Sequence, residues 1–236
     1  MEERVVGRAE LKLATAARAF GFDFAGKTVL DIGSSTGGFT EYALRRGAAR
    51  VVAVEKGTQQ MKVPLRFDPR VALFEKTDFL QVVGENQVGE LVTAGDKVVN
   101  KADDLAGKQG KKAEQLVTAL QVGRESAAVQ GERLQVDVVL ADVSFVSLRE
   151  ILAHAKRVVA RRAEYLVMLK PQFEAFPDQL VQGVVKNERM RREIMKNFEQ
   201  WLGRNGFLVV KKRDNNEELR GKRGGNLERF YWLRSV

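Results

Sequence analysis

A glycine-rich turn between an apolar strand and a helix constrains the fold of this chain more than any other feature. Residues 27–32 (Lys-Thr-Val-Leu-Asp-Ile) predict a buried strand, residues 33–38 (Gly-Ser-Ser-Thr-Gly-Gly) a turn, and residues 39–46 a helix that ends at Gly47. A second apolar strand follows at residues 50–54. A strand, a crossover helix and a second strand within about 30 residues are typical of the opening of a parallel α/β sheet.

The remainder of the chain continues this alternation. Leu13, Ala17 and Phe20 recur at helical spacing and predict an amphipathic helix over residues 8–20. Further helices are expected at residues 148–159 and 188–202. Short apolar runs predict further buried strands at residues 71–74, 136–141, 165–169, 207–210 and 230–233. The chain has 236 residues, a length typical of one domain, so we expect residues 1–236 to form one α/β domain.

One long segment, residues 83–134, interrupts the alternation. It contains no aromatic residue, and its 7 basic and 8 acidic side chains nearly cancel, so the net charge of +9 resides elsewhere in the chain. Leu91, Val98 and Leu105 repeat every seven residues, which favours an inserted helical hairpin. A long flexible loop is the alternative interpretation.

Composition narrows the classes of function. Lys and Arg outnumber Asp and Glu by 40 to 31, which favours polyanionic partners, nucleic acid first and an anionic membrane second. The absence of cysteine excludes disulfides and thiolate metal sites, and a single histidine, His154, makes Ser-His-Asp hydrolysis and a histidine-rich metal site improbable. No apolar run reaches the roughly 18 residues that span a bilayer, and no signal peptide is evident, so a cytoplasmic location is expected.

The glycine turn and the strand ends around it have the chemistry of a nucleotide site. Glycine lets the backbone approach a ligand closely, and the following helix N-terminus attracts negative charge. Glu55, at the end of the second strand, is placed to accept hydrogen bonds from both ribose hydroxyls of an adenosine, and Asp78 to face the adenine. The pattern D-x-G-x-x-x-G-G differs from the dinucleotide pattern and favours a methyltransferase-type turn over a nicotinamide site, although a plain tight turn remains the structural alternative. The predicted cofactor-binding residues are Asp31, Gly33, Ser34, Ser35, Gly37, Gly38, Phe39, Glu55, Asp78 and Asp142.

Five separated motifs together resemble one known family. They are Gly-Arg-Ala-Glu-Leu-Lys-Leu at residues 7–13, Leu-Asp-Ile-Gly-Ser-Ser-Thr-Gly-Gly-Phe-Thr at 30–40, Asp-Val-Ser-Phe-Val-Ser-Leu at 142–148, Leu-Lys-Pro-Gln-Phe-Glu at 169–174 and Gly-Asn-Leu-Glu at 225–228. The sequence resembles the TlyA (haemolysin A) branch of the FtsJ-like ribosomal RNA methyltransferases. The resemblance implies a Rossmann-like fold with a mainly parallel seven-stranded sheet and an antiparallel last strand. It also implies S-adenosylmethionine as cofactor and a ribose 2′-hydroxyl of ribosomal RNA as methyl acceptor.

The resemblance further implies a Lys-Asp-Lys-Glu catalytic tetrad, which falls on Lys12, Asp142, Lys170 and Glu228. In our hypothesis Lys170 is the general base, since a lysine serves as a base when burial and a neighbouring cation lower its pKa. Lys12 supplies that cation and a hydrogen bond to the ribose, Asp142 orients Lys170, and Glu228, in the last strand, fixes Lys12. Taken singly, each residue has an ordinary structural interpretation, such as a solvated lysine or a helix cap.

Basic residues near the tetrad are the predicted RNA contacts, because phosphate contacts supply most nonspecific affinity. They are Arg8, Lys211, Lys212, Arg220, Lys222 and Arg223. Members of this branch usually carry an N-terminal RNA-binding domain, which this chain is expected to lack. Two other functions stay open: a noncatalytic RNA-binding or ribosome-assembly protein that keeps the fold, and a membrane-active haemolysin.

Overall fold

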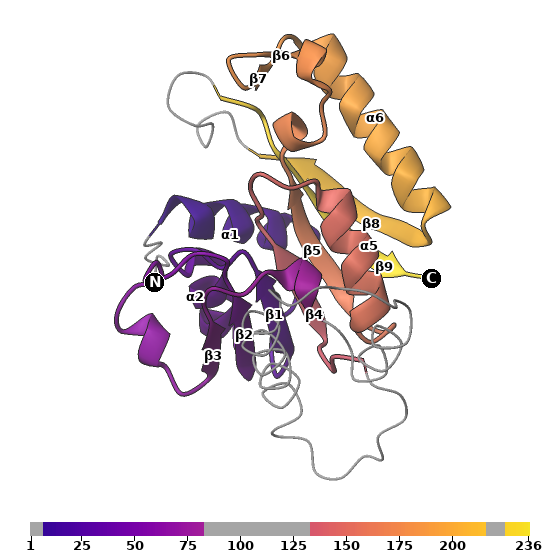
Figure 1. Cartoon of the computed structure of the whole chain (residues 1–236). Helices are drawn as coiled ribbons and strands as arrows, with labels where there is room; N and C mark the ends of the chain where they lie inside the picture. The colour runs from indigo at the N-terminus through magenta and orange to yellow at the C-terminus, as the bar shows by residue number, and fades with distance from the viewer. Residues whose placement is uncertain (1–6, 83–132, 216–224) are drawn as a thin grey trace, which may run out of the picture.

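A seven-stranded sheet forms the centre of the molecule, with its strands in the order β3-β2-β1-β4-β5-β9-β8 (Figure 1). The computed structural model describes residues 7–82, 133–215 and 225–236. Neighbouring strands from β3 to β5 pair in parallel, whereas β9 is antiparallel to both β5 and β8. The strands are β1 (Thr28–Ile32), β2 (Arg50–Val54), β3 (Val71–Phe74), β4 (Val138–Ala141), β5 (Glu164–Leu169), β8 (Phe207–Asp214) and β9 (Arg229–Ser235).

Helices cover both faces of this sheet, as expected for strands whose side chains are apolar on both sides. One face packs against α1 (Arg8–Phe20) and α2 (Gly38–Arg45), and the other against α5 (Leu148–Val158) and α6 (Glu188–Arg204). Each face therefore has its own buried cluster of side chains, and the sheet separates the two. The prediction of an α/β fold with a mainly parallel sheet and an antiparallel last strand is confirmed.

Contacts between α1 and α2 fix the position of the helix that carries Lys12. Glu10 of α1 is buried and forms an ion pair with Arg45 of α2. A Cβ atom at Gly38 would lie 3.0 Å from the backbone nitrogen of Glu10, so a larger residue would push the helices apart. At the other end of α1, Gly21 adopts φ +65° and its N–H bonds to Ala17 and Arg18, which ends the helix as predicted.

A two-stranded hairpin outside the main sheet was not predicted. It consists of β6 (Leu180–Val181) and β7 (Val184–Val185), and lies between β5 and α6 in sequence. Asn226 holds it, because the Asn226 side chain accepts a hydrogen bond from the Val185 N–H at 2.8 Å and donates one to the Gly183 carbonyl at 3.0 Å. The remaining short elements are 3-10 turns: η1 (Leu65–Phe67), η2 (Phe79–Gln81), η3 (Pro171–Phe173) and η4 (Pro177–Gln179).

The predicted elements differ from the observed ones mainly at their ends. The edge strand β8 extends to Asp214 rather than residue 210, since charged side chains such as Lys211 and Lys212 are tolerated at a sheet edge. The predicted helical hairpin lies outside the described residues except for positions 133 and 134. Leu134 is already buried and bridges to Val159, so the domain resumes there. Within the described part of the chain, no helix combines the length and apolar character needed to cross a bilayer.

Candidate active site

The carboxyl ends of the parallel strands bring the predicted site residues to one edge of the sheet. Glu55 follows β2, Asp142 follows β4 and Lys170 follows β5. Asp78 comes four residues after β3 and begins the turn η2. Open parallel sheets bind ligands at this edge, because the loops that leave the strands surround a crevice there.

The turn after β1 brings the backbone close to the loop after β4. Gly33 has φ +78°, a conformation that L side chains rarely adopt, and a Cβ atom there would lie 3.3 Å from the carbonyl oxygen of Asp142. Glycine at this position therefore allows the two loops to form one wall. Ser35 also has a positive φ, +48°, and lies beside the cavity that this wall encloses.

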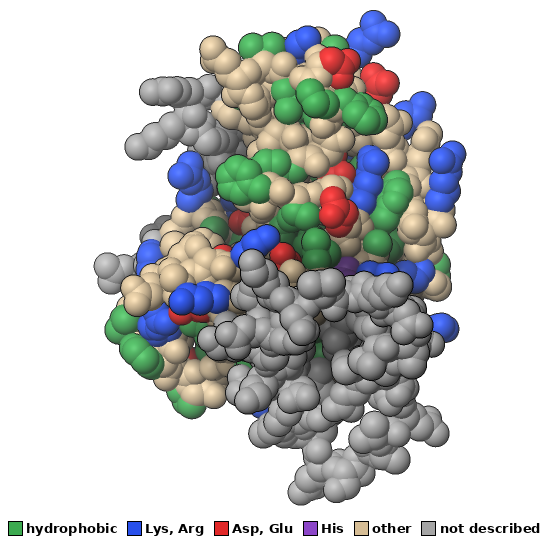
Figure 2. All heavy atoms as spheres, in the orientation of Figure 1, with side chains coloured by type: hydrophobic (Ala, Val, Ile, Leu, Met, Phe, Trp, Pro, Cys, Tyr) green, Lys and Arg blue, Asp and Glu red, His purple; other side chains and the backbone are tan. Residues whose placement is uncertain are grey.

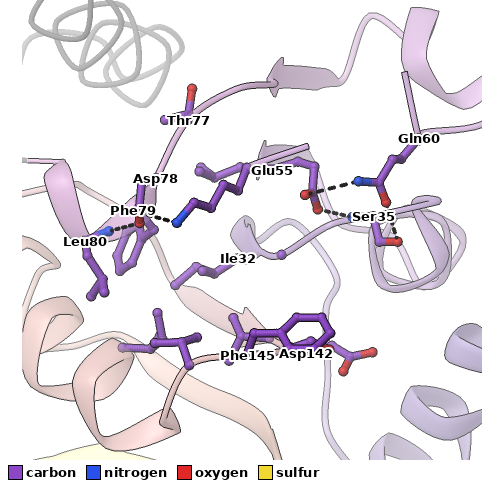
Figure 3. A pocket seen from close by; sticks show the side chains of 17 residues that line it. Ile32, Ser35, Glu55, Gln60, Thr77, Asp78, Phe79, Leu80, Asp142 and Phe145 are labelled. Atoms are coloured by element: carbon purple, nitrogen blue, oxygen red, sulfur yellow. Dashed lines mark hydrogen bonds and ion pairs between the residues drawn. The ribbon is translucent and has the colours of Figure 1, made fainter. Parts of the chain in front are cut away.

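A cavity of about 630 Å³ opens between these loops (Figure 3). Glu55, Gln60 and Asp78 lie along one side, and Asp142 and Phe145 lie opposite them. The floor between these polar groups is apolar and consists of Ile32, Val54, Phe79, Leu80, Val143, Val146 and Ile151. An apolar slot with a few carboxylates at its rim suits a ligand with a flat ring and several hydroxyl groups.

Only part of the predicted cofactor set borders this cavity. Five of the predicted residues line it: Gly33, Ser35, Glu55, Asp78 and Asp142. The other five do not line it: Ser34, Gly37 and Gly38 belong to the glycine turn itself, Asp31 lies in β1, and Phe39 lies in the first turn of α2. The Phe39 ring is buried in the cluster under α1 and α2, 5.9 Å from the ring of Phe230.

Neutral donors hold the carboxylate of Glu55. Its two oxygens accept hydrogen bonds from the backbone N–H of Ser35 at 2.8 Å and of Gly57 at 2.7 Å. Glu55 therefore faces the cavity in a fixed orientation, and its remaining lone pairs can accept ligand hydroxyl groups. Asp78 is held by the Leu80 N–H at 3.1 Å and by the ammonium of Lys56 at 3.0 Å.

Behind the glycine turn lies a fully buried carboxyl group, Asp31. The Thr40 hydroxyl donates a hydrogen bond to Asp31 Oδ2 at 2.6 Å, while Asp31 Oδ1 has no hydrogen-bond partner among the described residues. Burial raises the pKa of Asp31 to about 7, and the hydrogen bond from Thr40 lowers it only in part. Asp142 and Glu55 add like charge in the same direction.

Two lysine–carboxylate pairs lie on the other side of the site. Lys170 Nζ is 2.6 Å from Asp142 Oδ1 and donates a hydrogen bond to the hydroxyl of Ser144 at 2.9 Å. Lys12 Nζ, from α1, is 2.5 Å from Glu228 Oε2. All four paired side chains are at most 18% exposed, so each pair is shielded from water. The structure thus brings the members of each predicted tetrad pair into contact, with Glu228 one residue before β9 rather than inside it.

The predicted RNA contacts have varied surroundings. Arg8 is exposed at the start of α1. Lys211 donates to the Phe20 carbonyl at 2.6 Å, and Lys212 forms an ion pair with Glu199 at 2.7 Å. Arg220, Lys222 and Arg223 lie outside the described residues. On the face that Figure 2 shows, Lys and Arg side chains are scattered over the described surface, with a few acidic side chains among them.

Some residues at the site were not predicted, although they belong to the five sequence motifs given above. Ser144 and Phe145 follow Asp142, and the Phe145 side chain is 94% exposed beside the cavity, with its ring 5.4 Å from that of Phe173. Glu174 is buried and accepts hydrogen bonds from the Ser147 hydroxyl at 2.8 Å and the Leu148 N–H at 2.6 Å. It therefore fastens the loop after β5 to the start of α5. The single histidine, His154, is buried, and its ring nitrogen Nε2 lies 2.7 Å from the Val82 carbonyl oxygen.

The residues around the cavity fit the cofactor that the sequence implies. An adenosine needs an apolar slot for the base and acceptors for the ribose hydroxyls, and the floor residues and Glu55 provide them. Among the described residues, one oxygen of Asp31, in β1, and the hydroxyl of Ser34, in the glycine turn, are buried without a hydrogen-bond partner. Such polar atoms are expected where a ligand supplies the missing partners.

Comparisons with known proteins agree with this geometry. Residues 5–226 match the model of the family described as FtsJ-like methyltransferase. The chain is 32% identical over 235 residues, or 99% of its length and 70% of the relative's, to the 16S/23S rRNA (cytidine-2′-O)-methyltransferase TlyA of Mycobacterium tuberculosis.

Solved structures place the fold in the same group. A Lactococcus lactis protein described as a candidate hemolysin superposes with a TM-score of 0.73 at 28% identity, over 98% of this chain and 89% of that one. An S-adenosylmethionine-dependent methyltransferase of Mesorhizobium loti shares the fold, with a TM-score of 0.54 at 11% identity over 97% of this chain and all of the other. The chain therefore belongs to the FtsJ-like family of S-adenosylmethionine-dependent methyltransferases, in its TlyA (haemolysin A) branch.

Proposed function

We propose that this protein transfers the methyl group of S-adenosylmethionine to a ribose 2′-hydroxyl of ribosomal RNA, with Lys170 as the general base. The 2′-O specificity named for the M. tuberculosis relative supports the reaction class. The observation that carries the proposal is the Lys170–Asp142 pair, 2.6 Å apart at the wall of the cavity and shielded from water. A ribose hydroxyl is a weak acid, so methylating its oxygen requires a nearby group that accepts the proton.

When bound, S-adenosylmethionine supplies an electrophilic methyl group on a positively charged sulfur, so the protein must supply alignment and a base. Lys170, in its neutral form, accepts the hydroxyl proton at Nζ while the ribose oxygen takes up the methyl group. Asp142 and Ser144 hold that nitrogen at the cavity wall from two directions. A fixed nitrogen is needed because proton transfer requires a distance of about 3 Å between the heavy atoms.

Lys12 has the second role in this proposal. Its ammonium, held by Glu228 at 2.5 Å, donates a hydrogen bond to the ribose and places a positive charge near the reacting oxygen. On the opposite side, Glu55 accepts hydrogen bonds from the cofactor ribose and Asp78 faces the adenine. Asp31, Gly33, Ser34, Ser35, Gly37, Gly38 and Phe39 shape the turn beside them.

Arg8 and the basic group Arg220, Lys222 and Arg223 are the proposed RNA contacts. Arg8 lies four residues before Lys12 on α1, and the basic group precedes Glu228 by a few residues. Lys211 and Lys212 already have protein partners, so binding RNA there requires exchanging those partners for phosphates. Phosphate contacts of this kind weaken as salt concentration rises.

A methyl-transfer assay on purified ribosomal subunits tests the proposal. Radiolabelled S-adenosylmethionine and nucleoside analysis of the product distinguish 2′-O-methylation from base methylation. Lys170→Met removes the base and keeps the length of the side chain, so we expect turnover to fall by about 100-fold or more. Affinity for S-adenosylhomocysteine, measured by calorimetry, should stay within about three-fold, because Lys170 does not line the cavity floor.

Lys196→Ala is the matched control, since Lys196 is an exposed lysine on α6. It should keep wild-type turnover. Full activity of Lys170→Met would eliminate Lys170 as the base. A folded wild-type protein that binds S-adenosylhomocysteine and ribosomal subunits but methylates neither would favour the noncatalytic RNA-binding alternative.

A further inference from the structure

Asn215, the residue after β8, lies against the carboxylate of Glu228. Its side chain is buried, with the residue only 7% exposed. The amide Nδ2 donates a hydrogen bond to Glu228 Oε2 at 3.1 Å and a second, weaker one to the sulfur of Met168 at 3.4 Å. The same carboxylate oxygen receives the ammonium of Lys12 at 2.5 Å. One oxygen of Glu228 is therefore held by a charged donor on one side and a neutral donor on another.

Strand pairing alone does not explain this side chain. The backbone N–H of Asn215 already bonds to the Glu228 carbonyl at 3.0 Å and continues the pairing of β8 with β9. The side-chain amide adds a separate contact, and burying it costs free energy unless its N–H groups find acceptors. The opposite amide orientation would place Asn215 Oδ1 against a carboxylate, so the hydrogen-bond network fixes the orientation described above.

The position of Asn215 connects the two lysine–carboxylate pairs. It contacts Glu228 directly, and through Met168 it touches β5 two residues before Lys170. An asparagine is a neutral donor at any pH, so it orients Glu228 without changing the charge balance with Lys12. A carboxylate at this position would give Lys12 two negative partners, and an apolar residue would leave Glu228 with the lysine alone.

We propose that Asn215 is a positioning residue for methyl transfer: it fixes the Glu228 carboxylate and, through it, the Lys12 ammonium. This inference rests on the proposed function, in which Lys12 contacts the ribose. The Asn215 side chain itself touches neither the reacting atoms nor the cavity. Its role is to keep Lys12 at a fixed place relative to Lys170.

Two substitutions separate this role from simple packing. Asn215→Asp keeps the size and adds a charge, while Asn215→Leu keeps a similar shape and removes the donor. For Asn215→Asp we expect kcat to fall by about ten-fold, with S-adenosylhomocysteine affinity near wild type. The acid limb of the pH–rate profile should move up by about one pH unit, because an added carboxylate favours the protonated form of the lysines near it. Asn205→Asp, an exposed position after α6 at the opposite edge of the sheet, makes the same charge change and should alter neither quantity.

A second measurement on the protein alone keeps the test independent of methyl transfer. Labelling of Lys12 by acetic anhydride, followed over pH by peptide mass spectrometry, reports the charge state of its amine. Asn215→Asp should move the Lys12 labelling curve to higher pH, because an added carboxylate favours the ammonium. Asn205→Asp should leave the curve in place.

The outcomes distinguish the two proposals. Wild-type kcat and pH profile in both Asn215→Asp and Asn215→Leu would overturn the positioning role. If the wild-type protein methylates no ribosomal RNA, the proposed function fails, and the labelling curve still decides: a shift supports the contact of Asn215 with the Lys12–Glu228 pair. An unchanged Lys12 labelling curve overturns the contact of Asn215 with the Lys12–Glu228 pair, whatever the methyltransferase activity of the protein.

Discussion

The carboxylates in the two halves of the site have different kinds of partner. On the side of β1 and β2, Asp31 is bonded to the Thr40 hydroxyl and Glu55 to backbone N–H groups. On the side of β4, β5 and β9, Asp142 and Glu228 each lie 2.5–2.6 Å from the side-chain nitrogen of a lysine. Asp78 is the exception on the first side, and its partner Lys56 is 80% exposed at the rim.

This difference separates binding from chemistry. Neutral donors orient a carboxylate and leave its charge and spare lone pairs for a ligand, which suits hydroxyl groups of a cofactor. A shielded lysine–carboxylate pair instead holds an amine nitrogen at a fixed place, which we propose to be the proton acceptor at Lys170 and a positive charge at Lys12. Changes in the first half should therefore alter affinity or stability, and changes in the second half should alter turnover.

Replacing Asp31 should have the largest effect, because no cation among the described residues pairs with its buried carboxyl group. Its pKa is raised from 3.8 to about 7, so the folded protein binds a proton that the unfolded chain releases in this range. Stability is then greatest below pH 4 and is lost as the pH rises to about 7, by up to about 4 kcal/mol for this group alone. Asp31→Asn should abolish this dependence, making the variant more stable than wild type at pH 8 and similar at pH 4. Urea unfolding at both pH values measures the difference.

Asp23→Asn is the control for Asp31, since it removes a carboxylate that is exposed. It should leave the pH dependence of stability as in wild type. An Asp31→Asn protein with an unchanged slope between pH 4 and pH 7 would mean that Asp31 is already ionised, and that the first half holds a paired carboxylate after all.

The Lys12–Glu228 pair gives the next largest effect. Lys12→Met and Glu228→Gln should each lower kcat by about 100-fold, and the double variant should be no slower than either single one, because the two residues act as a unit. The Arg70–Asp68 pair is a comparison outside the site: its atoms are 2.7 Å apart, but its arginine is 50% exposed. A double-mutant cycle there should leave kcat unchanged and give a coupling free energy of less than about 1 kcal/mol. Additive losses in the Lys12–Glu228 cycle would contradict a shared role.

The two halves of the site also differ in how much of each could be predicted from the sequence. The contacts of Glu55 and Asp31 join residues close in the chain, such as Ser35 to Glu55 and Asp31 to Thr40. The alternation of apolar runs and glycines was therefore enough to predict the turn, the strand ends and the acid after β2. Burial patterns do not distinguish a glycine-turn residue that faces a ligand from one that packs, so Phe39, which is buried near Phe230, stays a predicted cofactor residue.

The lysine pairs could not be derived in this way. Lys12 and Glu228 are 216 residues apart, and they meet only because β9 inserts between β5 and β8 while α1 packs across the sheet. No periodicity in the sequence encodes that insertion, and the pairing was expected only through a family resemblance. The family resemblance did not indicate Asn215 either, because this residue belongs to none of the five motifs. Its proposed role depends on its place at the end of the edge strand β8.

Glu55 gives the smallest of these effects and sharpens the contrast most directly. In Glu55→Gln one of the two side-chain atoms facing the backbone N–H groups of Ser35 and Gly57 becomes a donor, so one of these hydrogen bonds is lost and the acceptor for ribose hydroxyls is weakened. We expect S-adenosylhomocysteine affinity to fall by about ten-fold, as for the loss of one or two hydrogen bonds to a charged group, and kcat at saturating cofactor to stay near wild type. Calorimetry and saturation kinetics on the same preparation measure both quantities, with Glu193→Gln on the exposed side of α6 as control. A variant that binds normally but turns over slowly would assign Glu55 to the chemistry, and the division of the site into a binding half and a reacting half would be wrong.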